Sequence, residues 1–188
     1  MAGQGLVQQL VWTVPLWLGA PVLAQSATVV SIGDGDTLRV RLGGEVRSVR
    51  LACIDAPERA QSPWGQQARA QLQALLPLGA AVEVRSTTSD RYGRLVAQLS
   101  RGGRNVNQAL VASGAAFVYW RYIAGCDRQT YGRLETEARL QRLGVWGASS
   151  GLMRPWEYRA GRRRSGSSSS APAILRTGDT RGTALRSI

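Results

Sequence analysis

A glycine pair between two strand-like runs is the feature that most constrains the fold of this chain. Residues 36–42 alternate between apolar side chains and charged or polar ones, chiefly arginines. Gly43-Gly44 follows, and residues 45–54 continue as a longer apolar-rich run. Gly-Gly between two such runs predicts a β-hairpin with one buried face. Broken alternation between Val46 and Val49 indicates a bulge in the second strand.

Further strands and helices follow the same reasoning. Apolar runs with β-branched residues predict strands at residues 27–32, 81–86 and 94–100. Apolar residues at helical spacing predict helices from the cap Ser62 to Leu76, from Asn105 to Ser113 and from Asp127 to Leu143. Five short strands with a helix after the third fit an OB-fold barrel. We therefore expect an α+β fold, a five-stranded OB-fold β-barrel with three helices.

The two ends of the chain differ from the middle. Residues 6–24 are almost wholly apolar, contain two prolines and end in Val22-Leu23-Ala24. This pattern predicts a signal peptide over residues 1–24 that is cleaved on export to the periplasm or medium, although no basic residue precedes it. A retained membrane anchor is the alternative. Residues 25–158 form the expected folded domain, and residues 159–188, rich in Ser, Gly and Arg, are expected to be a disordered tail.

The chain carries a formal net charge of +12, and all 24 of its basic residues are arginines. Residues 25–158 hold 17 Arg against 11 acidic residues, and residues 159–188 hold 7 Arg against 1. A basic body and tail suggest a polyanionic partner, nucleic acid first and an anionic membrane surface second. A coding bias toward arginine explains the charge equally well.

Cys53 and Cys126 are the two cysteines of the chain. In an oxidising compartment they are natural partners. A disulfide between them would close a long loop and stabilise the folded state by roughly 4 kcal/mol. Two buried free thiols are the alternative.

Charged residues cluster where the longer strand ends. Arg50, Asp55 and Glu58 lie there, Asp36 lies upstream in a glycine turn, and Arg94 follows in a later turn. Two carboxylates suit a hard cation. Since the chain has no histidine, the third carboxylate is the candidate base. Arginine forks suit phosphate groups. Taken singly, each residue is better explained as a turn, surface or ion-pair residue.

These segments resemble the staphylococcal nuclease (thermonuclease) family. The resemblance rests on Gly33-Asp34-Gly35-Asp36-Thr37, Arg50…Asp55-Ala56-Pro57-Glu58 and Asp90-Arg91-Tyr92-Gly93-Arg94, in that order, and covers about residues 27–146. It implies calcium-dependent hydrolysis of DNA and RNA that leaves 3′-phosphate ends.

The resemblance also implies a role for each matching residue. Asp36 and Asp55 are expected to bind Ca²⁺ through their carboxylates, and Ala56, which replaces a threonine, through its backbone carbonyl. Glu58 is the expected general base, and Arg50 and Arg94 the expected phosphate-binding arginines. The residues expected to contact substrate are Arg91, Tyr92, Trp120 and Tyr122. Of these, Arg91 replaces a lysine of the family and Trp120 replaces a tyrosine.

The resulting hypothesis is an exported calcium-dependent nuclease with low sequence specificity. Its substrates would be single-stranded DNA and RNA. We expect a monomer with no stable protein partner and no membrane span once the signal is cleaved. The alternative is a non-catalytic nucleic-acid-binding OB-fold module. Members of that kind lack parts of the acidic set, whereas Asp36, Asp55 and Glu58 are all present here.

Overall fold

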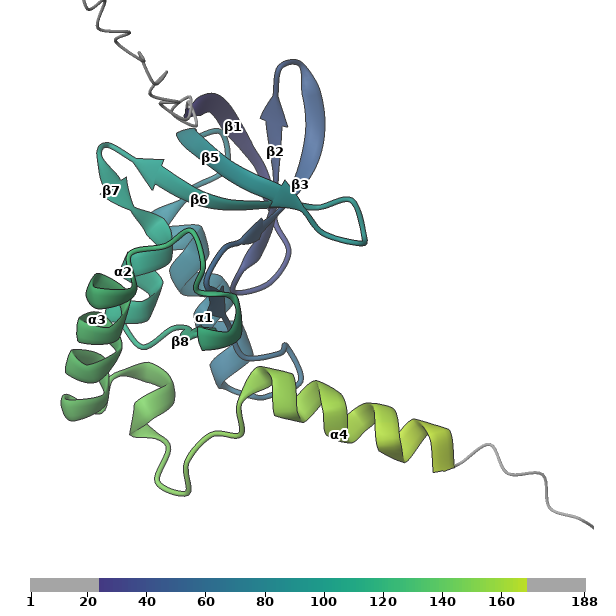
Figure 1. Cartoon of the computed structure of the whole chain (residues 1–188), viewed down its shortest axis with the longest axis vertical. Helices are drawn as coiled ribbons and strands as arrows, with labels where there is room; N and C mark the ends of the chain where they lie inside the picture. The colour runs from purple at the N-terminus through teal and green to yellow at the C-terminus, as the bar shows by residue number, and fades with distance from the viewer. Residues whose placement is uncertain (1–23, 169–188) are drawn as a thin grey trace, which may run out of the picture.

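A computed structural model describes residues 24–168, from the first strand to the end of a fourth helix (Figure 1). Two 3₁₀ turns, Trp120–Tyr122 and Gly144–Gly147, lie on either side of the helix Arg128–Leu140 in the sequence. The strands are β1 Gln25–Ile32, β2 Thr37–Leu42, β3 Glu45–Leu51, β4 Ile54–Asp55, β5 Ala81–Ser89, β6 Leu95–Arg101, β7 Arg104–Asn105 and β8 Phe117–Val118. The helices are α1 Trp64–Leu75, α2 Val106–Ala112, α3 Arg128–Leu140 and α4 Pro155–Ser168.

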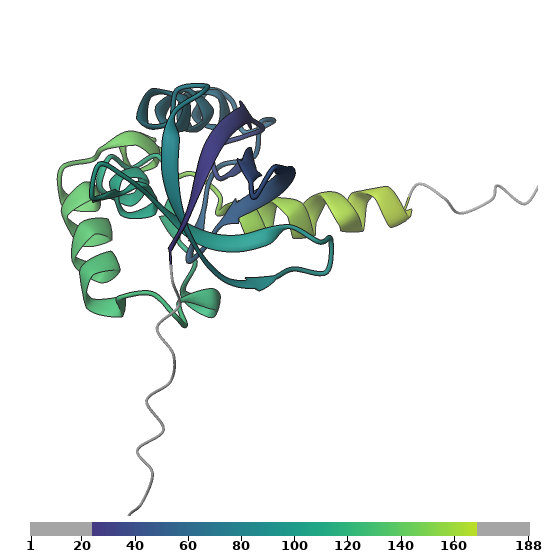
Figure 2. The same cartoon turned by 90° about the horizontal axis from the view of Figure 1, so that it is seen from above.

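Five strands form a closed barrel, which confirms the expected fold. The hydrogen-bonded order is β3-β2-β1-β5-β6, and parallel pairing of β3 with β6 closes the sheet on itself. Gly43 and Gly44 make the β2–β3 turn with φ of 58° and 89°, a conformation that suits glycine. Helices α1, α2 and α3 lie at one end of the barrel, and α4 runs outward from it in both views (Figures 1 and 2).

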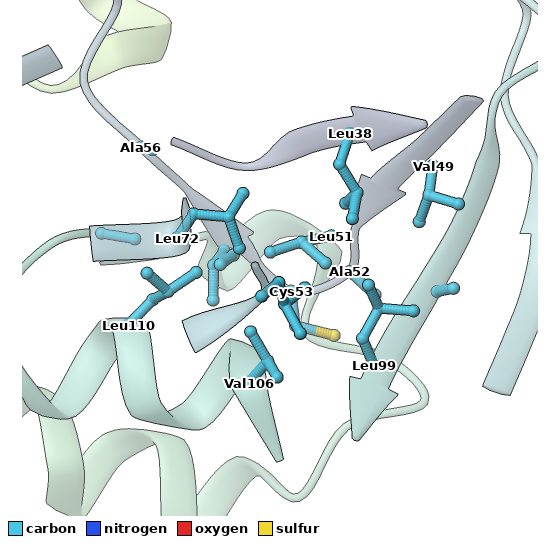
Figure 3. Packing of buried hydrophobic residues seen from close by; sticks show 14 of the residues in the cluster. Leu38, Val49, Leu51, Ala52, Cys53, Ala56, Leu72, Leu99, Val106 and Leu110 are labelled. Carbon is cyan, nitrogen blue, oxygen red and sulfur yellow. The ribbon is translucent and has the colours of Figure 1, made fainter. Parts of the chain in front are cut away.

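The core lies inside the barrel and under its helices. Leu38, Val40 and Val49 are fully buried, as the alternation predicts, whereas Arg39 and Arg41 are exposed. Leu72 from α1 and Leu110 from α2 are fully buried and belong to the same apolar cluster as Leu51 and Cys53 (Figure 3). Burying these aliphatic side chains, at about 1.5–3 kcal/mol each, is the main force that closes the barrel.

Three local expectations were wrong. The β2–β3 register is unbroken from Thr37↔Arg50 to Leu42↔Glu45, so no bulge lies at residues 46–49; the register shifts fall in β1 and β5 instead. The expected strand 45–54 breaks into β3 and β4 at Ala52-Cys53, because Cys53 adopts a φ of 65°. Pro63, not Ser62, occupies the N-cap position of α1.

Two of the expected helix caps are confirmed. Asn105 and Asp127 cap α2 and α3 with their side-chain oxygens.

Helix α4 was not expected. It carries residues 159–168, the first part of the expected disordered tail. The expected domain boundary at residues 158/159 therefore falls inside a helix. The rest of that tail, and the expected signal peptide up to residue 23, lie outside the described residues.

None of the helices in residues 24–168 is long and apolar enough to cross a membrane.

Candidate active site

The turn before β2 and the end of β3 and β4 bring three acidic side chains and one arginine together. Asp36 is 5% exposed and Asp55 1% exposed, while Glu58 is half-buried. The turn packs closely on Ala56, the residue after β4: a Cβ added to Gly35 would lie only 2.6 Å from the Cβ of Ala56. The backbone N–H of Ala56 donates to Asp36 Oδ2 at 2.6 Å, which orients that carboxylate.

Arg50 joins the two buried aspartates. Its Nη1 lies 2.8 Å from Asp36 Oδ2, and its Nη2 lies 2.7 Å from Asp55 Oδ1. Burial opposes ionisation of Arg50, but the charges of Asp36 and Asp55 outweigh it and raise the pKa of the guanidinium. The expected phosphate-binding arginine therefore binds the expected metal carboxylates in this structure.

Asp36 has an unusual protonation equilibrium. Burial raises its pKa to about 7, and the neighbouring carboxylates Asp34 and Asp55 add to the shift, against the opposing charge of Arg50 and the N–H of Ala56. Asp34 itself accepts the backbone N–H of Asp36, as a turn residue does. Asp36 thus exchanges a proton near neutral pH, the range in which cation binding competes with protonation.

A second arginine, Arg159 of α4, binds the other side of the cluster. Its Nη2 lies 2.6 Å from Asp55 Oδ2, and its Nη1 lies 2.6 Å from Glu58 Oε1 and 3.2 Å from Asp55 Oδ1. Desolvation opposes the charge, but the hydrogen bonds to Asp55 and Glu58 raise the pKa of Arg159. Asp55 therefore accepts from Arg50 on one oxygen and from Arg159 on both.

Sequence reasoning missed Arg159 because it assigned the residue to a disordered tail. The signal for a helix was present in Pro155-Trp156-Glu157, where a proline in the first turn precedes an acidic residue. Nothing local in the sequence pairs Arg159 with Asp55, which lies 104 residues earlier.

Arg94, Arg91 and Tyr92 lie on the turn between β5 and β6, and Arg94 directly precedes Leu95, which pairs with Val49 of β3. Arg94 donates from Nε to Asp90 Oδ2 at 2.7 Å, and Asp90 Oδ1 accepts the backbone N–H of Tyr92 and Arg94. Both arginines lie over the exposed Tyr92 ring, at 4.8 Å and 5.5 Å from its centroid. The turn extends to the same side of the barrel as α4 (Figures 1 and 2).

Trp120 and Tyr122 form an exposed aromatic surface after β8. Trp120 donates from Nε1 to Glu135 Oε2 at 3.0 Å and lies under Arg128. Tyr122 is 57% exposed and packs edge-on against Tyr119, which stacks on Trp156 of α4. The exposed rings offer flat surfaces of the kind on which nucleobases stack.

Cys53 and Cys126 form a disulfide with an S–S distance of 2.07 Å. Cys53 directly precedes β4, and Cys126 directly precedes the cap of α3. The bridge therefore ties the strand that carries Asp55 to the segment that follows Trp120 and Tyr122.

The acidic cluster fits a hard cation by its donor chemistry. Asp36 and Asp55 each direct a carboxylate oxygen at the guanidinium of Arg50, so both carboxylates face one cationic group. Within residues 24–168, no group of three or more His, Cys, Asp or Glu side chains is arranged as a metal site. Calcium takes 6–8 oxygen ligands, so two carboxylates alone would not complete its coordination.

The chain is similar in sequence to known nucleases. The family model described as "Staphylococcal nuclease homologue" matches residues 48–148. A micrococcal nuclease from Shigella flexneri is 37% identical over 80% of this chain and 86% of its own. An uncharacterised endonuclease from Escherichia coli O157:H7 is 36% identical over 70% of this chain and 82% of its own. A staphylococcal-like nuclease from Arabidopsis thaliana is 36% identical over 61% of this chain. The matched region covers 34% of that longer protein.

The matched segment includes Arg50, Asp55, Glu58 and Arg94, but it begins after Asp36 and ends before α4. The closed barrel and these matches together show that the chain belongs to the staphylococcal nuclease family of hydrolytic nucleases.

Proposed function

We propose that this nuclease is exported, depends on calcium, and hydrolyses DNA and RNA with low sequence specificity, leaving 3′-phosphate ends. The observation that carries the proposal is the convergence of Asp36 and Asp55 on one cationic position, with the half-buried Glu58 beside them. Export is supported by the apolar residues 6–24 and by the Cys53–Cys126 disulfide, which suits an oxidising compartment.

Asp36 and Asp55 would hold the calcium ion through their carboxylates, and Ala56 through its backbone carbonyl. When bound, the ion polarises a phosphate oxygen and orients the phosphodiester. Burial of both aspartates favours this role, because a buried carboxylate gains more from a cation than a solvated one does.

Glu58 would accept a proton from the attacking water. The oxygen of that water bonds to phosphorus, and the bond from phosphorus to the 5′ oxygen breaks. The 5′ oxygen then takes a proton from solvent, which leaves a 5′-hydroxyl and a 3′-phosphate. Arg50 and Arg94 would neutralise the charge that grows on the phosphate oxygens, and such contacts are worth about 3–4 kcal/mol of barrier each.

The surrounding surface suits a single strand. Arg91, Tyr92, Trp120 and Tyr122 are exposed and combine positive charge with flat rings, which bind the backbone and stack on bases of any sequence. Low sequence preference and a preference for unpaired substrate follow from this composition. A monomer is sufficient, since every residue of the proposed site comes from one chain.

The test begins with protein starting at Gln25, incubated with single-stranded DNA and RNA in calcium or in EGTA. We expect cleavage only with calcium and 3′-phosphate ends in the products. Activity in excess EGTA would exclude the calcium mechanism. Binding without cleavage would exclude the proposed chemistry at this cluster.

The base assignment is tested by Glu58→Gln. We expect kcat to fall about 10²–10⁴-fold, because the amide cannot accept the proton. Glu45→Gln is the matched control, since Glu45 is exposed and pairs only weakly with Arg47 at 3.7 Å in the β2–β3 hairpin. Near-normal turnover in folded Glu58→Gln protein would remove Glu58 from the mechanism.

A further inference from the structure

Helix α4 is firmly attached to the wall of the active site. Trp156 stacks on Tyr119 with ring centroids 4.9 Å apart and planes 2° apart, and it meets Phe117 edge-on. Gln61 donates to the backbone oxygen of Met153 at 2.8 Å, just before the buried Pro155. These contacts fix the first turn of α4 against β8.

The attachment places Arg159 at the acidic cluster. Phe117 of β8 pairs directly with Asp55 of β4, so the strand on which α4 packs is hydrogen-bonded to the strand that carries the expected metal ligand. Arg159 follows Trp156 by three residues and therefore lies on the same face of the helix. Its guanidinium reaches Asp55 and Glu58 while its side chain keeps 35% exposure, which leaves it an outward path to solvent.

Arg159 and a divalent cation would draw on the same oxygens. Arg159 contacts both carboxylate oxygens of Asp55, at 2.6 Å and 3.2 Å, and one of Glu58. A divalent cation at these oxygens would take the positions that the guanidinium of Arg159 occupies, and the two positive charges would repel each other. Arg50 also pairs with Asp55, but it is the family's expected phosphate ligand, whereas no role is assigned to Arg159.

We propose that Arg159 is a further residue of the active site, an internal cation that competes with calcium for Asp55 and so sets the calcium affinity of the enzyme. The proposal rests on the calcium site proposed above. A calcium ion at these oxygens would displace the guanidinium of Arg159 from Asp55. The first turn of α4, which Trp156 holds against Tyr119, would keep Arg159 close by, so that it returns when the ion leaves. The chain thereby neutralises Asp55 and Glu58 when calcium is scarce.

The test compares calcium binding, by isothermal titration calorimetry without substrate, in the full chain from Gln25 and in three variants. In Arg159→Gln we expect about tenfold tighter calcium binding, a value that allows for the partial exposure of the ion pair. Arg159→Lys keeps the charge but loses the two-pronged contact, so its affinity should lie between the two. Arg162→Gln removes the same charge from an exposed position on the same helix and should bind calcium as the unchanged protein does.

Circular dichroism and thermal melting would check that each variant is folded. Calcium affinity in Arg159→Gln equal to or weaker than in Arg162→Gln would overturn the inference. The proposed function is judged separately: it stands after such a result as long as EGTA stops cleavage by the unchanged protein. Absence of calcium binding in every protein would overturn both this inference and the calcium mechanism.

Discussion

Loss of the Cys53–Cys126 disulfide is the perturbation whose effect follows most directly from the structure. The bridge spans 73 residues of sequence, from the start of β4 to the cap of α3. Reducing it frees that whole segment in the unfolded chain. In the folded chain the surrounding contacts persist, because Tyr119 still donates to the backbone oxygen of Cys53 and β4 still pairs with β8.

The loop-closure relation gives the magnitude. For a loop of this length the entropy lost by the unfolded chain corresponds to about 4 kcal/mol at 25 °C. A domain of this size loses roughly 4 kcal/mol of stability per molar guanidinium chloride, so the unfolding midpoint should fall by about 1 M. The site should survive at 25 °C, since Asp55 keeps its strand pairing and its ion pairs.

The assay is guanidinium denaturation followed by tryptophan fluorescence, on oxidised protein, on protein reduced with dithiothreitol, and on Cys126→Ser. Cys126 is the better residue to replace, because it is half-buried whereas Cys53 lies in the core. The reduced protein and the variant should unfold at the same midpoint. A loss below about 1 kcal/mol in both would refute the loop-entropy reasoning. Disagreement between the two would show that the substitution itself perturbs the fold.

Other consequences follow from buried polar groups. Asn107→Ala removes the buried hydrogen bonds that join the Asn107 side chain to the backbone of Leu99, Ala52 and Ala97, so the free energy of unfolding should fall by about 3 kcal/mol. The cap variant Asn105→Ala should lower it by only about 1 kcal/mol. Denaturant titration measures both values. Because the pKa of Asp36 is raised to about 7, calcium affinity should fall about tenfold per pH unit below 7, and a calorimetric profile flat from pH 5 to 8 would contradict this. The stability that Asp36 contributes is present below pH 4 and is lost as the pH rises through 7, so Asp36→Asn should raise Tm more at pH 8 than at pH 5.

The barrel could be read from the sequence because its signals are local. Alternation across residues 36–42 and the Gly43-Gly44 turn determine which face of the hairpin is buried, and the structure buries Leu38 and Val40 accordingly. The caps Asn105 and Asp127 act through neighbouring backbone groups, so they too were visible. The exceptions are equally local: a positive φ at Cys53 splits one strand, which no side-chain pattern announces.

The candidate site was visible in its residues but not in its pairing. Short segments of sequence were enough to select Asp36, Arg50, Asp55 and Glu58 as candidate site residues. Carboxylates and arginines at strand ends are the groups that phosphodiester chemistry needs. The chain alone did not say that Arg50 would bind both aspartates, or that Arg94 would pair with Asp90 on a separate turn.

Only the tertiary structure brought α4 to the site. The sequence determined that Pro155 and Trp156 can begin a helix, but the position of that helix depends on Tyr119, Phe117 and Gln61, which meet it only after the barrel has closed. The ion pairs of Arg159 with Asp55 and Glu58 join residues about a hundred positions apart. Contacts of this range depend on packing and not on local pattern, which is why the sequence placed Arg159 in a disordered tail and not at the acidic cluster.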